Sequence, residues 1–327
     1  MKKLAKQLIS TERNRQISEV LDEWILALRA AHRSDKTIEG YTEQIGRFLW
    51  WLRELEHSED MESIEPAQIR LFVQYLQTNK ERWGSDNLQA KRKLSDASVQ
   101  SYFRSLRAFF NFAAREQFIE ASPFDDRRLP TPKIRKKIVP SFSLDDVRAM
   151  LNAAGQDSVN ALRDVAIILM LLDTGMRATE ACNLKLDDLE PGRIKVLAKG
   201  DKERYLPLLP ETEKAIRDYK RKERAPGGEH LFLGRGLNPL TYDGFKEVIR
   251  RRAREAGVQH AHPHKFRHTF ALDWLSSGGP LHALQSLLGH SSPVMSMKYA
   301  EMVSKDATDL HKQHSPVERL GNWKKRK

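Results

Sequence analysis

The stretch "HPHKFRHTF" (residues 262–270) places three histidines, an arginine and a lysine within nine residues. On a helix, His264 lies three residues from Arg267 and four from His268, so the three side chains can share one face. Zinc sites of the HExxH type carry a glutamate between the two histidines, and none stands here. A phosphate fits these residues better, because the arginine can bind two oxygens while the imidazole moves a proton.

The composition of the whole chain also favours a polyanionic partner. The 327 residues include 56 Lys and Arg against 44 Asp and Glu, a formal net charge of +12. Such an excess predicts binding to nucleic acid or to an acidic membrane surface. The longest apolar run, "VAIILMLL" (165–172), is far shorter than the ~20 residues that a spanning helix needs. We therefore expect no membrane partner.

The cysteine count and the N-terminus narrow the setting further. Cys182 is the only cysteine, which excludes an internal disulfide and a thiolate zinc site. The basic N-terminus lacks the apolar region of a signal peptide. We expect a cytoplasmic, nucleoid-associated protein that uses no metal or other cofactor.

The apolar periodicity predicts a helical first domain over residues 15–120, after a tail of residues 1–14. Apolar residues recur at helical spacing in three stretches, residues 37–52, 64–76 and 95–114. Residues 121–142 contain four prolines and six lysines or arginines without periodicity, which predicts an extended linker. Its basic run, Arg135, Lys136 and Lys137, is expected either to cross a DNA backbone or simply to be solvated.

A second, mainly helical domain with a small antiparallel sheet is predicted over residues 143–303. Ser143 and Asp146 have the spacing of a capping box, and a long apolar helix is expected to end at Gly175. The stretch "RIKVLAKGDKERYLPL" (193–208) predicts two short strands around a "KGDK" turn. Further helices are expected near residues 211–224, 241–256, 264–276, 281–289 and 292–302, followed by a basic tail over 304–327.

Three further segments of this domain carry candidate chemical residues. Arg177 follows the glycine stop near a helix N-terminus, and Glu180 is spaced to hold its guanidinium. Lys199 and Lys202 lie in the hairpin turn. His290 and Tyr299 follow in "LLGHSSPVMSMKYAEM" (287–302). Taken singly, each has an ordinary explanation as a surface ion pair, an exposed turn lysine or a packed tyrosine.

Together these residues match the needs of phosphodiester chemistry. Attack on a phosphodiester adds a second negative charge, which fixed arginines stabilise. A free tyrosine at pH 7 is about one part in a thousand phenolate, a deficit of roughly 4 kcal/mol that an imidazole and guanidiniums can offset. The departing 5′ oxygen needs a proton, which a lysine can supply. No bound metal is then required.

In these motifs and their order, the chain resembles the tyrosine recombinases, the family of phage integrases and Xer-type recombinases. The motifs are "TGMRATE", "AKGDKERYLPL", "HPHKFRHTF", "LLGH" and "KYA", and the resemblance runs from about residue 15 to 302. It implies these roles: phosphate binding by Arg177 and Arg267, support by Glu180, general acid at Lys199, proton transfer at His264, a phosphate hydrogen bond from His290 and nucleophilic attack by Tyr299. Lys202 remains the alternative general acid and DNA contact, His268 is expected to be structural, and Ser296 stands where threonine is common.

The resemblance also implies an architecture and partners. A SAM-like core-binding domain and a catalytic domain would clamp double-stranded DNA. Two protomers would occupy inverted-repeat core sites, and a tetramer would form the synapse. Residues beyond Met302 would pack on a neighbouring protomer, and an accessory directionality factor is a further candidate partner. No separate arm-site domain of the lambda-integrase kind is expected.

Three functions are compatible with these residues. The first is a site-specific recombinase that cleaves and rejoins DNA through a 3′-phosphotyrosyl intermediate, without ATP or metal. A type IB topoisomerase shares this chemistry, but the N-terminal helices and the implied tetramer argue against it. A non-catalytic DNA-binding protein would make the ordered chemical residues coincidental. The DNA target, cis or trans cleavage, and the choice among integration, excision, transposition and dimer resolution remain open.

Overall fold

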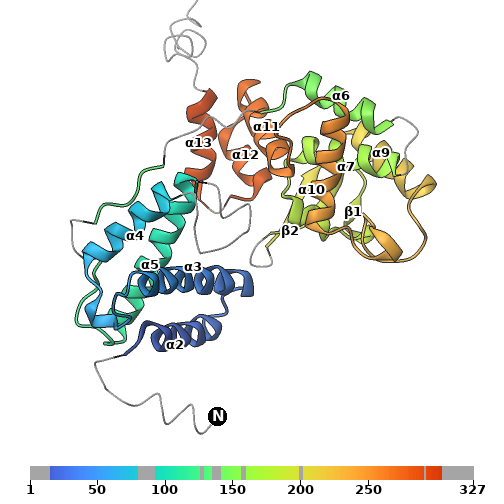
Figure 1. The fold of residues 1–327 in the computed structure, drawn as a ribbon. Coiled ribbons are helices and arrows are strands. Elements are labelled where there is room, and N and C mark those ends of the chain that lie inside the picture. The colour runs from blue at the N-terminus through green and yellow to red at the C-terminus, as the bar shows by residue number, and fades with distance from the viewer. Residues whose placement is uncertain are drawn as a thin grey trace, which may run out of the picture. The chain divides into compact units, whose positions relative to one another are not determined.

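The structure is a computed structural model that describes residues 15–79, 93–125, 129–134, 141–155, 160–198, 202–290 and 292–303. These residues are mostly helical with a three-stranded antiparallel sheet, which confirms the predicted fold class (Figure 1). The chain divides into two compact units, Met1–Lys137 and Ile138–Lys327. Each unit has its own hydrophobic core.

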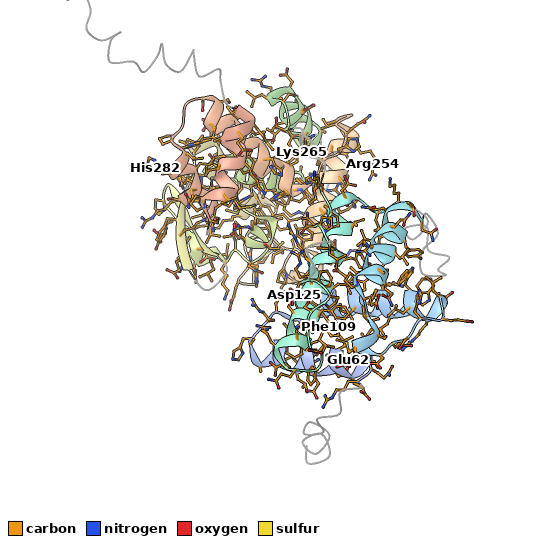
Figure 2. All side chains as sticks on the ribbon, turned by 90° about the vertical axis from the view of Figure 1, so that its left-hand side faces the viewer. Glu62, Phe109, Asp125, Arg254, Lys265 and His282 are labelled. Atoms are coloured by element: carbon orange, nitrogen blue, oxygen red, sulfur yellow. The ribbon has the colours of Figure 1, made fainter. Side chains whose placement is uncertain are left out.

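Three helices of the first unit correspond to the amphipathic stretches that the sequence predicts to be helices. Its core is rich in aromatic rings, such as Phe48 and Phe72, whose centroids lie 5.0 Å apart edge to face. Phe109, labelled in Figure 2, lies fully buried among these helices. The elements are α2 (Ile17–Ala30), α3 (Asp35–Glu54), η1 (Met61–Ser63), α4 (Pro66–Thr78) and α5 (Asp96–Arg115).

Both ends of the expected linker contain residues that pack into a core. Phe124 and Leu129 are buried in the core of the first unit. Phe142 belongs to the core of the second unit, where its N–H donates to the Thr269 hydroxyl at 2.9 Å. Isolated apolar residues between charges and prolines produce no periodicity, so the sequence pattern does not reveal these anchors.

The second unit packs its helices around α7, the apolar run that is too short to cross a bilayer. Helix α7 contacts α6, α9, α10 and α11. Ser143 and Asp146 form the predicted capping box, with reciprocal backbone-to-side-chain bonds of 2.9 and 3.0 Å. The helices are α6 (Leu144–Gly155), α7 (Ala161–Thr174), α8 (Ala178–Cys182), α9 (Pro210–Lys222), α10 (Tyr242–Glu255), α11 (Pro263–Ser276), α12 (Leu281–Leu288) and α13 (Pro293–Val303), with turns η2 (Leu186–Asp188) and η3 (Arg235–Leu237).

The sheet is a meander in the order β1-β2-β3, built from β1 (Leu189–Glu190), β2 (Arg193–Ala198) and β3 (Lys202–Pro207). The predicted hairpin is confirmed, and its register pairs Val196 with Arg204. Side chains alternate between the two faces of a strand, so Arg204 shares a face with Leu206. Leu206 is fully buried, which directs this face of β3 toward the core.

A buried ion cluster joins α7 to α10. The carboxylate of Asp164 accepts from Arg251 at 2.6 Å, from Arg252 at 2.8 Å and from the neighbouring Arg163 at 3.1 Å. Asp164 is completely buried, so its carboxylate is shielded from solvent. Among the described residues, these three guanidiniums alone balance its charge.

No helix in the described part of the chain has both the length and the apolar character needed to cross a membrane.

Candidate active site

The site begins where α7 ends. Gly175 adopts a left-handed backbone (φ 60°) at the C-terminus of α7, as expected for a glycine helix stop. A Cβ atom there would lie 2.4 Å from Cδ1 of Phe270, so a larger residue does not fit. The chain then becomes extended at Arg177, which caps the short helix α8. The glycine thus turns the chain so that Arg177 begins a new element.

Arg177 and Glu180 form the predicted pair. Nη1 of Arg177 donates to Oε1 of Glu180 at 2.9 Å, and the Arg177 backbone N–H donates to Oε2 at 2.8 Å. The Glu180 side chain is 6% exposed, whereas that of Arg177 is 39% exposed. The carboxylate is therefore buried, whereas the guanidinium that it binds is partly open to solvent.

Arg204 is a member of this site that the sequence analysis missed. Its Nη1 and Nη2 atoms donate to Oε1 and Oε2 of Glu180 at 3.1 and 2.8 Å. Burial by itself would raise the pKa of Glu180, but the hydrogen bonds from Arg204 and Arg177 outweigh it and hold that pKa below its ordinary value. The available signal was strand alternation, which places Arg204 on the buried face with Leu206.

Arg267 ties two helix ends together. Its guanidinium donates to the carbonyl of Gly175 at 3.0 Å and to that of Leu288 at 2.8 Å. Burial, together with the charge of Arg177, lowers the pKa of Arg267 to about 10, so it remains protonated at neutral pH. The residue is 1% exposed, which makes it a fixed positive charge beneath the surface.

Two histidines of α11 and the candidate nucleophile form a row of neighbouring rings. The ring of His264 lies 4.7 Å from that of His268, and the His268 ring lies 5.3 Å from that of Tyr299. His268, expected to be structural, is therefore adjacent to Tyr299. Part of His264 remains open to solvent. Burial of the rest, with the nearby His268 and Arg267, lowers its pKa to about 4, so the imidazole is neutral at pH 7.

Tyr299 comes from α13 and is 6% exposed. It packs in a small apolar cluster with Ala271, Leu284 and Leu288. Burial raises the pKa of its phenol, while the charges of Arg267 and Arg177 act in the opposite direction. Two cations thus act on this phenol from separate elements of the second unit.

His290 follows α12 and faces Tyr299. The two rings are nearly parallel, 3° apart in orientation, with centroids 6.4 Å apart. Its Nδ1 lies 2.8 Å from the hydroxyl of Ser296. Burial, followed by the charges of Arg267, Arg177 and Arg204, lowers the pKa of His290 to about 4. The ring is therefore a neutral hydrogen-bonding group at pH 7.

Some predicted residues lie outside the described residues. These are Lys199 in the hairpin turn and Arg135, Lys136 and Lys137 in the linker. Lys202 begins β3, but its side chain is also outside the description. Within the described ranges, no three His, Cys, Asp or Glu side chains are grouped as metal ligands.

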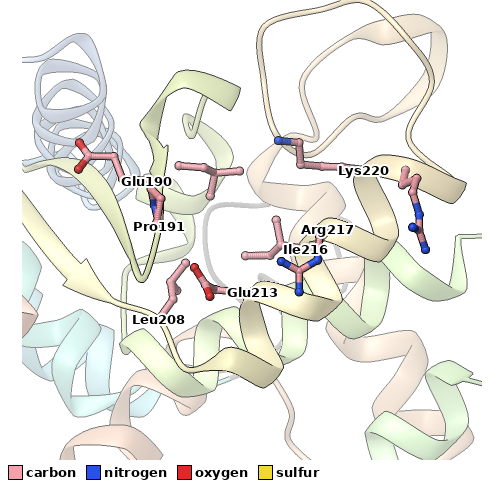
Figure 3. Close-up of a pocket in the computed structure, with 9 residues that line it drawn as sticks. Glu190, Pro191, Leu208, Glu213, Ile216, Arg217 and Lys220 are labelled. Carbon is pink, nitrogen blue, oxygen red and sulfur yellow. The ribbon is translucent and has the colours of Figure 1, made fainter.

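A surface hollow lies elsewhere in the same unit. It has a volume of about 480 Å³ and lies between the β1–β2 turn and α9, lined by Pro191, Leu208, Ile216 and neighbouring residues (Figure 3). None of the candidate chemical residues lines it.

The assembled groups are suited to an anion that gains charge. Arg177 and Arg204 both pair with the carboxylate of Glu180, and the buried Arg267 lies close enough to feel its charge. The ring of His290 lies parallel to that of Tyr299, with centroids 6.4 Å apart. Guanidiniums stabilise a phosphorane-like transition state, and neutral imidazoles can exchange protons with it. The arrangement therefore supports nucleophilic attack by a phenol on a phosphodiester.

Comparison with known proteins points in the same direction. The model of the phage integrase family matches residues 141–305, and that of the phage integrase N-terminal SAM-like domain matches residues 20–113. The tyrosine recombinase XerC of Leptospira interrogans is 31% identical over 290 residues, covering 86% of this chain and 88% of that relative.

Two solved structures show the likeness in fold. The Tn1549 transposon integrase in complex with a circular intermediate DNA has a TM-score of 0.70 at 19% identity, covering 93% of this chain and 99% of that chain. A lambda integrase tetramer bound to a Holliday junction has a TM-score of 0.67 at 18% identity, covering 88% of this chain and 81% of that chain.

Proposed function

Since the chain belongs to the phage integrase family of tyrosine recombinases, enzymes that cleave and rejoin DNA, we propose that Tyr299 is its nucleophile. The observation that carries this assignment is the convergence of Arg177, Arg267 and His290 on the phenol from three separate elements. Site-specific recombination is the function of this protein, and neither the topoisomerase nor the non-catalytic alternative is favoured.

The proposed reaction proceeds by in-line displacement. Tyr299 gives up its phenolic proton, with His264 as the proposed group that takes it up, and the phenolic oxygen bonds to phosphorus. The bond from phosphorus to the 5′ oxygen breaks, and its electron pair stays on that oxygen. Lys199, or Lys202 as the alternative, donates the proton that the leaving oxygen needs. His264 assists proton transfer, and His290 donates to a phosphate oxygen. A DNA strand thereby becomes joined to the protein through a 3′-phosphotyrosyl bond.

Stabilisation of the negative charge in the transition state is assigned to the arginines. Arg177 and Arg267 bind the non-bridging oxygens, and Glu180 supports Arg177. The covalent link conserves the free energy of the phosphodiester, so religation is the reverse displacement by a 5′ hydroxyl and consumes no ATP. No metal or other cofactor enters these steps.

The proposed architecture assigns both parts of the chain to DNA. Residues 15–120 form the core-binding domain and residues 143–303 the catalytic domain, with tails over 1–14 and 304–327. The linker, residues 121–142, crosses the backbone through Arg135, Lys136 and Lys137. The net charge of +12 supports such binding.

The proposed assembly is a dimer on an inverted-repeat core site and a tetramer in the synapse. The solved structures with this fold include a lambda integrase dimer bound to a core site and a lambda integrase tetramer bound to a Holliday junction. The enzyme is proposed to act in the cytoplasm at the nucleoid, where its duplex substrate lies, with an accessory directionality factor as a further partner.

The test begins with selection of bound sites from random duplexes. The selected site is then nicked near the cleavage position. The short fragment that carries the free 5′ hydroxyl diffuses away after cleavage, so religation is prevented and any adduct is trapped. We expect a covalent protein–DNA complex in the presence of a chelator and without ATP. Binding without any adduct would support a non-catalytic protein, and relaxation of plasmids that lack the selected site would support a topoisomerase.

A further inference from the structure

We propose that Arg204 is a positioning residue, which occupies the Glu180 carboxylate so that Arg177 keeps its remaining N–H donors for the phosphate. This inference rests on the proposed function, in which Arg177 binds the scissile phosphate. Arg204 itself does not touch the DNA in this account. It acts through Glu180 and Arg177.

The hydrogen bonds to Glu180 supply the first step. An ionised carboxylate can accept about four hydrogen bonds. Glu180 accepts two from Arg177, through the backbone N–H and Nη1, and two from Arg204, through Nη1 and Nη2. Its acceptor sites are therefore filled, and Arg204 supplies half of the donors.

The two arginines are used differently. Arg204 is held at all three nitrogens, because its Nε also donates to the carbonyl of Leu287 at 3.0 Å, and its side chain is 12% exposed. Arg177 gives only one guanidinium nitrogen to Glu180, and no other guanidinium hydrogen bond of Arg177 occurs among the described residues. Its side chain is 39% exposed, so its other donors face outward. Arg204 is a fixed neutralising group, and Arg177 is the group left for a ligand.

Loss of Arg204 would change this division. Glu180 is buried, and a buried carboxylate that loses donors is strongly driven to find others. Arg177 is already in contact and can turn its second nitrogen onto the vacated oxygen, which gives the two-pronged geometry favoured by arginine and carboxylate. The charge and donors of Arg177 would then be directed at Glu180 instead of at the phosphate.

The guanidinium of Arg204 also lies against the turn that leads to His290. Gly289 has a left-handed backbone (φ 63°), and a Cβ atom there would lie 2.9 Å from Nη1 of Arg204. Together with the bond to the carbonyl of Leu287, this close approach fixes the guanidinium between α12 and Glu180. Arg204 is thus held in place by backbone on one side and by the carboxylate on the other.

The test compares two substrates that differ in the charge of the scissile group. One is the selected site with its natural phosphodiester, and the other carries an uncharged methylphosphonate at the cleavage position. Single-turnover cleavage rates are measured for the wild-type protein and for Arg204→Ala. We expect the variant to cleave the phosphodiester roughly 10- to 100-fold more slowly, the range for loss of a charge-assisted hydrogen bond. On the methylphosphonate its rate should stay within about threefold of wild type, since there is less charge to stabilise.

Three further variants make the result specific. Arg204→Lys keeps a charge without the two-pronged geometry and should give an intermediate rate, which preserves the test if the alanine variant does not fold. The double variant with Glu180→Gln and Arg204→Ala should cleave the phosphodiester faster than Arg204→Ala alone, because an amide competes less than a carboxylate for Arg177. Arg193→Ala is the matched control: its guanidinium pairs with Glu190 at 2.7 Å on the neighbouring strand, and both rates should be unchanged.

Equal slowing of both substrates by Arg204→Ala would overturn the inference and leave a purely structural ion pair. Wild-type cleavage by this variant would overturn it as well. Arg177→Ala separates this failure from failure of the proposed function. If Arg177→Ala shows the same loss on both substrates, the phosphate-binding role of Arg177 is wrong. If its loss is confined to the phosphodiester, that role stands whatever Arg204 does.

Discussion

The hydroxyl of Ser296 lies 2.8 Å from Nδ1 of His290, which joins the segment after α12 to the helix that carries Tyr299. Ser296 is completely buried, and Tyr299 follows it by three residues on the same face of α13. With Nδ1 engaged, Nε2 is the nitrogen of His290 left for a phosphate oxygen. The orientation of one candidate chemical group is therefore set by the helix that presents another.

We expect Ser296→Ala to slow cleavage about tenfold while DNA affinity stays the same, because a lost hydrogen bond of about 1 kcal/mol or more frees the His290 ring. Ser296→Thr keeps the hydroxyl and should restore the rate. Single-turnover cleavage and a binding isotherm give the two readouts. An alanine variant that cleaves at the wild-type rate would show that His290 is oriented by other contacts.

The pH dependence of stability should report the burial of His290. Burial, with the charges of Arg267 and Arg177, lowers its pKa to about 4, whereas an unfolded chain has about 6.5. Between these values the unfolded state binds more protons, so the free energy of unfolding decreases as pH falls from about 6.5 to about 4. Above pH 6.5 this group has no effect. The thermal midpoints at pH 7 and pH 5 should therefore differ less in His290→Gln than in the wild type. An equal difference in the wild type and the variant would contradict the assignment.

The buried cluster at Asp164 should be a major determinant of stability. Asp164→Asn leaves Arg163, Arg251 and Arg252 without their shared anion, and loss of one partner from a buried pair costs about 3–5 kcal/mol. Hydrogen exchange of the α7 amides in the full-length protein measures the loss. Asp145→Asn is the control, since the Asp145 side chain is 88% exposed in its pair with Arg148 and should change stability by less than ~1 kcal/mol.

The choice between Lys199 and Lys202 can be made with a sulfur leaving group. Loss of a general acid slows cleavage roughly 10²- to 10⁴-fold. A substrate with sulfur in place of the 5′ bridging oxygen leaves without a proton, so it should restore the rate of Lys199→Ala. Lys202→Ala should cleave both substrates nearly normally. The opposite pattern would transfer the role to Lys202.

Features set by residues close in sequence were predicted well. The three helical stripes of the first unit, the Ser143–Asp146 cap and the Gly175 helix stop all depend on spacings of four residues or fewer. The contact between Arg177 and Glu180 belongs to the same class.

Several contacts between distant segments were not predicted. Arg252 meets Asp164 across 88 residues, and Arg204 meets Glu180 across 24 residues. The approach of the Tyr299 ring on α13 to that of His268 on α11, 5.3 Å between centroids, was likewise not predicted. Local patterns predict which face of an element is buried, but they do not identify the partner across that face.

The most direct measurement is the identity of the residue that becomes bonded to DNA. The trapped complex is digested with protease, and the peptide that carries the 3′-linked nucleotide is sequenced by mass spectrometry. Our account predicts that the modified residue is Tyr299, and that Tyr299→Phe binds the site with unchanged affinity but forms no adduct. An adduct on any other residue, or one formed by Tyr299→Phe, would contradict it.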